Sequence, residues 1–100
     1  MITTKQRSYL KSLAHHLQPI FQIGKGGISE NVIIQYEEAF ETKELIKTSV
    51  LNNSEFNAKE ACELIAEKTH ADIVQVIGSK FVLYRPSRKN RKIELPVKKR

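Results

Sequence analysis

The sequence predicts a single small domain of the α/β class, in a two-layer α+β arrangement with the element order αβαβαββ. Three amphipathic helical segments alternate with short apolar strands, and two strands follow each other directly at the end of this pattern. Because two strand-helix-strand crossovers precede a hairpin, we expect a four-stranded mixed sheet in which three strands run parallel and the last strand is antiparallel. One hundred residues are enough to bury one such core but not two.

The first helix is expected from about residue 4 to residue 16. Apolar residues recur there with helical spacing, at Leu10, Leu13, Ala14 and Leu17. Thr3 or Thr4 can cap its start, and Pro19 begins an extended segment after it. The basic residues fall largely off the apolar stripe, at Lys5, Arg7 and Lys11. Such a basic face is compatible with a solvated surface and with a binding groove.

Ser29 and Asn57 mark the starts of the other two helices. Ser29 can cap a helix with Tyr36 and Phe40 on its apolar side. The opposite side of that helix is acidic and is not expected to face RNA; it carries Glu37, Glu38 and Glu41. Asn57 has an acidic residue three positions later, which is the spacing of a capping box.

The four strands are expected at residues 20–23, 44–51, 72–77 and 80–84. In the strand at 44–51 apolar residues alternate with polar ones, so that Lys47 points away from the core. Gly78 and Ser79 separate the last two strands. A glycine at the first position of a two-residue turn favours a type II′ hairpin.

A glycine loop, Gly24-Lys25-Gly26-Gly27, lies between the first strand and the second helix. Without Cβ atoms, the loop lets another backbone approach within hydrogen-bonding distance. The unsatisfied N–H groups at the start of the following helix, at the positive end of its dipole, favour an anion such as phosphate. Lys25 would add a mobile positive charge. A tight turn that only needs positive φ would use the same residues, so the local sequence leaves both interpretations open.

The formal charge of +6 is concentrated at the C-terminal end. Between Arg85 and Arg100, eight basic residues and one acidic residue give a balance of +7, whereas residues 1–84 sum to −1. A polybasic segment next to a near-neutral domain favours a polyanionic partner, because each neutralised phosphate releases counterions. We expect a folded domain at residues 1–86 and a basic, flexible tail at 87–100.

Several classes of function lack support in the sequence. No signal peptide or membrane-spanning run is visible, so we expect a cytoplasmic protein without a membrane partner. Cys62 is the only cysteine and reads as a small core residue. His15 and His16 would point about 100° apart on a helix, which does not suit one metal ion. We therefore expect no metal, no cofactor, no small-molecule substrate and no enzymatic activity.

Four segments together resemble the YhbY-like CRM family, the chloroplast RNA splicing and ribosome maturation domains. They are residues 10–15 (LKSLAH), 22–28 (QIGKGGI), 44–47 (ELIK) and 83–86 (LYRP). The resemblance runs from about Thr3 to Pro86. It implies a fold similar to the C-terminal domain of bacterial translation initiation factor three, with the GxxG loop at Gly24 to Gly27 proposed to touch RNA. Stand-alone bacterial members associate with precursors of the large ribosomal subunit, which implies a role in ribosome assembly.

The expected site is a backbone clamp of the kind found in KH domains, where a GxxG loop holds the sugar-phosphate chain. Flanking contacts are expected from basic residues outside the loop, at Lys5, Arg7, Lys11, Lys47, Arg85, Arg88 and Lys89. The expected partner is ribosomal RNA, bound by a monomer. The alternative is a protein-interaction module that docks on a ribosomal protein or a GTPase and uses the basic tail as a nonspecific anchor.

Overall fold

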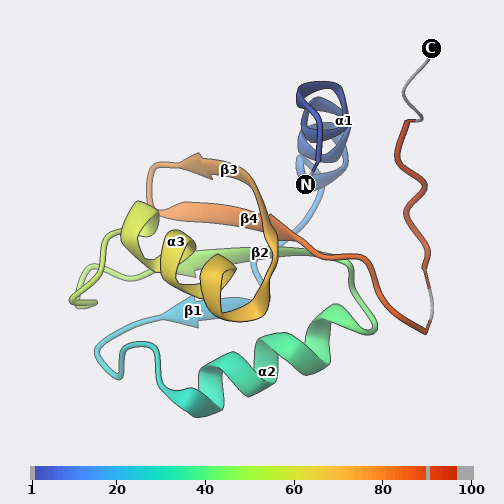
Figure 1. The fold of residues 1–100 in the computed structure, drawn as a ribbon. Helices are drawn as coiled ribbons and strands as arrows, with labels where there is room; N and C mark the ends of the chain where they lie inside the picture. The colour runs from blue at the N-terminus through green and yellow to red at the C-terminus, as the bar shows by residue number, and fades with distance from the viewer. Residues whose placement is uncertain (1, 90, 97–100) are drawn as a thin grey trace.

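Residues 2–89 and 91–96 are described by a computed structural model, in which the elements follow the predicted order (Figure 1). The helices are α1 (Thr4–Ala14), α2 (Glu30–Phe40) and α3 (Ala58–Thr69). The strands are β1 (Phe21–Ile23), β2 (Leu45–Val50), β3 (Asp72–Ile77) and β4 (Lys80–Tyr84). The order αβαβαββ is therefore confirmed, and the last two strands match the predicted bounds.

The strands form one mixed sheet with the spatial order β1-β2-β4-β3. β1 pairs parallel with β2, and β4 runs antiparallel to both of its neighbours, β2 and β3. The prediction of three parallel strands and a last antiparallel strand is thus confirmed. Gly78 has φ +57° at the first turn position, as a type II′ hairpin turn requires. The hairpin turn lies at the same end of the sheet as the carboxyl ends of β1 and β2 (Figure 1).

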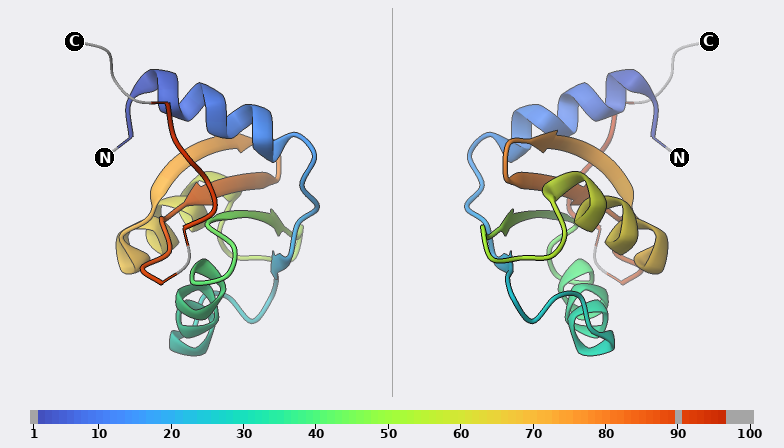
Figure 2. Two further views of the ribbon diagram at one scale, coloured as in Figure 1. Left: turned by 90° about the vertical axis from the view of Figure 1, so that its right-hand side faces the viewer. Right: turned by 90° about the vertical axis from the view of Figure 1, so that its left-hand side faces the viewer.

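Helices cover both faces of this sheet, so the domain has three layers rather than the two predicted from the sequence. α2 and α3 pack on one face, through a cluster that includes Tyr36 and Phe40. α1 lies on the opposite face (Figure 2) and packs there through Leu10 and Ala14. The sequence feature that indicates this third layer is the run of four apolar residues at 81–84 in β4, all of which are buried. A strand with consecutive apolar residues is typical of burial on both faces.

Each helix begins at a polar side chain that satisfies its first N–H groups. Thr3 caps α1 and Asn57 caps α3, and both form a capping box with the residue three positions later. The Oγ of Ser29 accepts from the N–H of Val32 (3.3 Å) at the start of α2. The expected caps are therefore confirmed, with Thr3 rather than Thr4 at the first helix.

The first helix ends at Ala14, earlier than the predicted end near residue 16. After it the backbone tightens, because the N–H of Leu17 donates to the carbonyl of Ala14, three residues back (3.0 Å). The chain then enters the extended segment at Pro19. This early end leaves part of the sheet face next to β2 and β4 without a helix over it, as the cavity described below shows.

The C-terminal segment packs against the domain, which differs from the expectation of a flexible tail from residue 87 onward. The buried carboxylate of Glu44 accepts backbone N–H groups of Ser87 (2.7 Å), Lys92 (2.7 Å) and Ile93 (2.8 Å). Burial by itself would raise the pKa of Glu44, but these N–H groups outweigh it and hold the pKa below its usual value. Residue 90 and residues 97–100, with three of the basic residues of the tail, lie outside the described residues.

Candidate nucleic-acid interface

The glycine loop forms an exposed turn between β1 and α2. The N–H of Gly27 donates to the carbonyl of Gly24 (3.0 Å) and closes the turn. Gly27 has φ +70°, a conformation that favours glycine. A Cβ on Gly24 would lie 3.3 Å from the Cδ1 of Leu51, so this glycine allows a close approach of the loop after β2. The fold therefore explains two of the three glycines.

Gly26 has no such explanation within the domain. Its φ is not positive, and a Cβ built on it would meet nothing within 4 Å. Lys25 and Gly26 are exposed, and neither of their backbone N–H groups has an acceptor among residues 2–89 and 91–96. The absence of a side chain at Gly26 thus keeps open a surface that the protein itself does not fill.

The charge around this loop is mixed. The side chain of Lys25 is exposed and has no carboxylate within 4 Å among the described residues. Glu30 lies in the first turn of α2 and is also exposed. Its carboxylate stabilises the helix start and would repel an anion placed there. The helix dipole and Lys25 favour an anion, and Glu30 opposes it.

The predicted basic residues of α1 and β2 differ in exposure and in whether their side chains contact backbone carbonyl oxygens of the domain. Lys5 and Lys11 are exposed on α1. Arg7 is half-buried, and its Nε donates to the carbonyl of Ile73 in β3 (3.1 Å). Lys47 is half-buried on the α1 side of the sheet, and its Nζ is 3.4 Å from the carbonyl oxygen of Leu17.

Arg85 is engaged inside the domain rather than free for a ligand. Its guanidinium donates to the Oε1 of Glu37 (2.9 Å) and to the carbonyl of Thr69 (2.9 Å). It also lies 3.5 Å from the Oε2 of Glu41 and 5.0 Å from the centre of the Phe40 ring. With a side chain only 15% exposed, Arg85 ties the end of β4 to α2 and α3.

Arg88 and Lys89, the remaining predicted residues of the tail, are exposed. Their backbone N–H groups are held, since that of Arg88 donates to Glu41 Oε1 (3.2 Å) and that of Lys89 to Ser87 Oγ (3.3 Å). The two residues are therefore held through their backbone beside Glu41, which caps the C-terminal end of α2. They do not share a surface cavity with the lysines of α1 and β2.

The structure does bring Lys11 and Lys47 together, with a third lysine that was not among the predicted site residues. Lys80 lines the same cavity, beside the C-terminal end of α1. The available signal was the hairpin register: Lys80 is opposite Ser49, and Lys47 lies two residues from Ser49 on the same face. Strand pairing is needed to see this, because the two lysines are far apart in the sequence.

The described residues offer little for covalent catalysis or metal binding. Cys62 is buried, and burial together with nearby Glu63 raises the pKa of its thiol to about 12. Among the residues that the structure describes, no three His, Cys, Asp or Glu side chains are grouped in a way that could hold a metal ion. None of the helices in that part of the chain has the length and apolarity to cross a membrane.

The fold and the site define a small α/β domain with an exposed glycine loop and lysines gathered on one face of its sheet. The chain belongs to the CRS1/YhbY (CRM) domain family, whose model matches residues 2–85. The predicted family is therefore confirmed.

Similar proteins have names that refer to RNA. The chain is 49% identical to "Probable RNA-binding protein YqeI" of Bacillus subtilis, over 96% of this chain and all of that protein. It is 41% identical to "RNA-binding protein" of Haemophilus influenzae, over 97% of each chain. A solution structure of the hypothetical protein SAV1595 from Staphylococcus aureus, proposed to bind RNA, has 54% sequence identity and a TM-score of 0.78, covering 96% of this chain and all of that one.

Proposed function

We propose that this protein binds RNA through its GxxG loop and nearby lysines, and that it acts in assembly of the large ribosomal subunit by binding rather than by catalysis. The observation that carries the loop proposal is the open space at Gly26. No contact within the domain requires a glycine there, because a Cβ on this residue would meet no atom within 4 Å. RNA as the partner class agrees with the names of the relatives. The ribosomal role extends the resemblance to stand-alone bacterial CRM proteins and implies a cytoplasmic location.

In the proposed contact, a phosphate lies against the loop. The free N–H groups of Lys25 and Gly26 donate to its oxygens, and the ammonium group of Lys25 adds a charge. A side chain at position 26 would stand between the phosphate and this backbone. Contacts of this kind position RNA without reading its bases, so the loop alone would confer little sequence preference.

The lysines of the α1 side supply the flanking charge. Lys5 and Lys11 are exposed, and Lys47 and Lys80 line the sheet face below α1. Arg7 and Arg85 are left out of this contact set because the domain itself engages them. Arg88 and Lys89 are accessible and add nonspecific attraction.

A binding titration with three single substitutions tests the loop. Lys25→Gln should weaken RNA binding and lower the salt slope by about one. Glu30→Gln should strengthen binding because it removes a repulsive charge. Gly26→Ala should weaken binding while leaving the Tm nearly unchanged, since the added methyl meets nothing in the domain. Lys59→Gln, an exposed lysine of α3, is the matched control.

If the Lys25→Gln and Gly26→Ala variants bind RNA like the wild type, the loop is not the contact. The ribosomal role is tested separately, by sedimentation of the tagged protein from cell extract with and without ribonuclease. We expect co-migration with precursors of the large subunit that ribonuclease abolishes. Co-migration that survives digestion would instead support docking on a ribosomal protein or a GTPase.

A further inference from the structure

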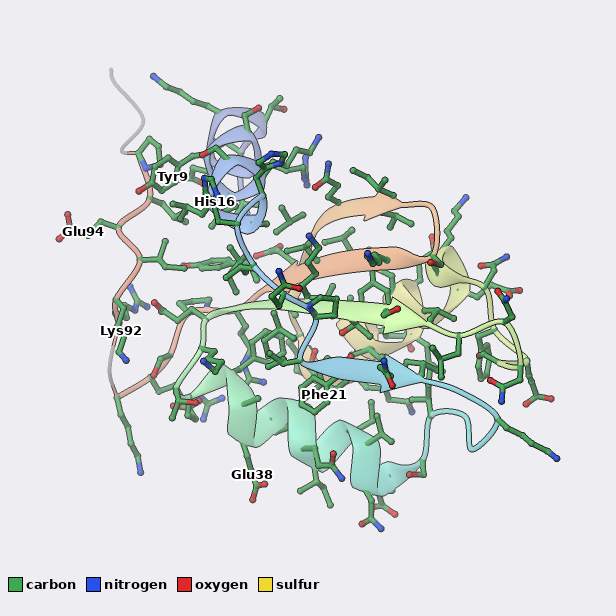
Figure 3. All side chains as sticks on the ribbon, turned by 180° about the vertical axis from the view of Figure 1, so that it is seen from behind. Tyr9, His16, Phe21, Glu38, Lys92 and Glu94 are labelled. Atoms are coloured by element: carbon green, nitrogen blue, oxygen red, sulfur yellow. The ribbon has the colours of Figure 1, made fainter. Side chains whose placement is uncertain are left out.

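A cavity of about 490 Å³ opens on the sheet face that α1 leaves uncovered. Residues of the last turn of α1, among them Lys11 and Ser12, form one wall, and residues of β2, β3 and β4 form the floor. The cavity exists because α1 ends at Ala14, while the sheet continues beyond it. Figure 3 shows this side of the molecule, with Tyr9 on α1, His16 in the turn that follows the helix, and Phe21 at β1.

The rim of the cavity carries uncompensated positive charge. Lys11, Lys47 and Lys80 come from three different elements and line the same hollow. No Asp or Glu of the described residues lines it, and none lies within 4 Å of these ammonium groups. Like charges that converge without a counter-charge repel each other, and an anion between them relieves this repulsion. The rim therefore suits a phosphate group.

The floor has a different chemistry from the rim. Ile77, which is 62% exposed, offers apolar surface, whereas Ala14 and Val82 line the bottom of the cavity and are almost fully buried. The Gln75 amide at the same hollow can donate and accept hydrogen bonds, and the Ser12 hydroxyl, which donates to the carbonyl of Tyr9 (2.6 Å), can accept one. An apolar floor with a few polar groups suits the flat face and polar edge of a nucleobase.

A row of residues in register crosses the sheet from the cavity to β1, the strand that precedes the glycine loop. Gln22 of β1, Ser49 of β2 and Lys80 of β4 are neighbours in register on one face. Adjacent strands lie about 4.8 Å apart, so this row spans roughly 10 Å. Gly24 follows two residues after Gln22. One strand of RNA can therefore reach both the loop and the cavity.

We propose that this cavity receives an unpaired nucleotide of the bound RNA, with its base on the apolar floor and its phosphate between the lysines. The inference rests on the proposed RNA binding and adds the class of RNA. A base paired inside a duplex cannot enter the hollow, whereas an unpaired base can be splayed into it. The domain thus prefers a single-stranded or bulged segment, and Gln75 gives it a preference among bases.

Binding of a fluorescent ten-nucleotide single strand, a duplex of the same sequence and a free mononucleotide tests this inference. Lys80→Gln should weaken binding of the single strand several-fold and lower its salt slope by about one. Gln75→Ala should reduce discrimination among homopolymers without changing the salt slope. Lys59→Gln, outside the cavity, should change neither. Crosslinking with 4-thiouridine RNA should label peptides that contain residues of β3 or β4.

The outcomes separate this inference from the proposed function. If Lys25→Gln weakens binding but Lys80→Gln does not, the loop contact stands and the cavity is not a nucleotide site. Equal affinity for duplex and single strand, or a mononucleotide that binds as tightly as the ten-nucleotide strand, would also overturn the inference. If the wild-type protein binds none of these RNAs, both proposals fail together.

Discussion

Glu44 holds the C-terminal segment, and replacing it with glutamine should release that segment. In the folded protein Oε2 of Glu44 accepts the N–H of Ser87, and Oε1 accepts the N–H groups of Lys92 and Ile93. A glutamine of the same shape keeps one oxygen and replaces the other by an NH₂ group. Two N–H groups can then still be accepted, while the third faces another donor.

The expected loss follows from this count. A hydrogen bond to a charged group contributes about 1.5–3 kcal/mol, and Glu44→Gln removes at least one such bond together with the charge that strengthens the others. We therefore expect a loss of about 1.5–3 kcal/mol in the free energy of unfolding. For a domain of this size, each kcal/mol lowers the Tm by roughly 4–8 °C. The loss is limited by undocking of the segment, after which its N–H groups bond to water.

The same carboxylate gives stability a defined pH dependence. Its pKa in the folded protein lies below the ordinary value, near 4.3, that it takes in the unfolded chain. The ionised carboxylate of Glu44 therefore stabilises the folded protein at pH values above about 4.3. This stabilisation is lost as the pH falls through the lower pKa that the group has in the folded protein. The difference in stability between wild type and Glu44→Gln should be constant above pH 5 and shrink below pH 4.

Thermal unfolding at several pH values, with amide hydrogen exchange at Ser87, Lys92 and Ile93, measures these effects. We expect protection of these amides in the wild type at pH 7 and faster exchange in Glu44→Gln. The control is Glu38→Gln, because Glu38 is exposed on the outer side of α2 (Figure 3). Unprotected amides in the wild type, or a Glu44→Gln variant as stable as the control, would refute the docking of this segment.

Two further predictions concern the core and the caps. Asn57→Ala should lower the free energy of unfolding by about 1 kcal/mol, because the Asn57 side chain caps α3 and accepts the N–H of Glu60 at 2.8 Å. The exposed Asn52 should tolerate alanine and serves as the control. Denaturant midpoints compare the two variants. The Cys62 thiol, buried and with a pKa of about 12, should resist a thiol reagent at pH 8 until denaturant is added; fast labelling of the native protein would show that this core opens.

Local signals in the sequence were enough to predict most of the fold. The caps at Ser29 and Asn57 and the turn at Gly78 depend on residues within three or four positions, and all three are present as expected. The inner face of α3 also follows from periodicity, and Cys62 lies in the core as predicted. Each of these features is decided by neighbours in the chain.

The docking of the C-terminal segment could not be predicted in this way. It depends on Glu44, which meets partners 43 to 49 residues away. Glutamate side chains are usually exposed to solvent, and the residues next to Glu44 in the sequence give no sign that this one is buried. The many basic residues of the C-terminal segment indicated a solvated, flexible tail. Ile93 and Leu95 of that segment instead pack on the α1 side of the core. Their apolar side chains were the one available clue.

The fold separates the basic residues by the chemistry of their side chains. Arg7 and Arg85 have guanidinium groups with several donors in fixed directions, and the domain uses them to join elements through carbonyl and carboxylate oxygens. Lys11, Lys25 and Lys80 have compact charges on flexible stems and face outward with no carboxylate close by in the described chain. Residues 1–84 carry a net charge of only −1, so attraction of RNA to the domain would depend on where these charges lie rather than on their sum. Glu37 and Glu38 lie on α2, which packs on the face of the sheet opposite to α1. In the proposed contact, a phosphate chain would therefore approach from the α1 side and reach both the cavity and the glycine loop, where Glu30 at the start of α2 is the carboxylate that opposes it.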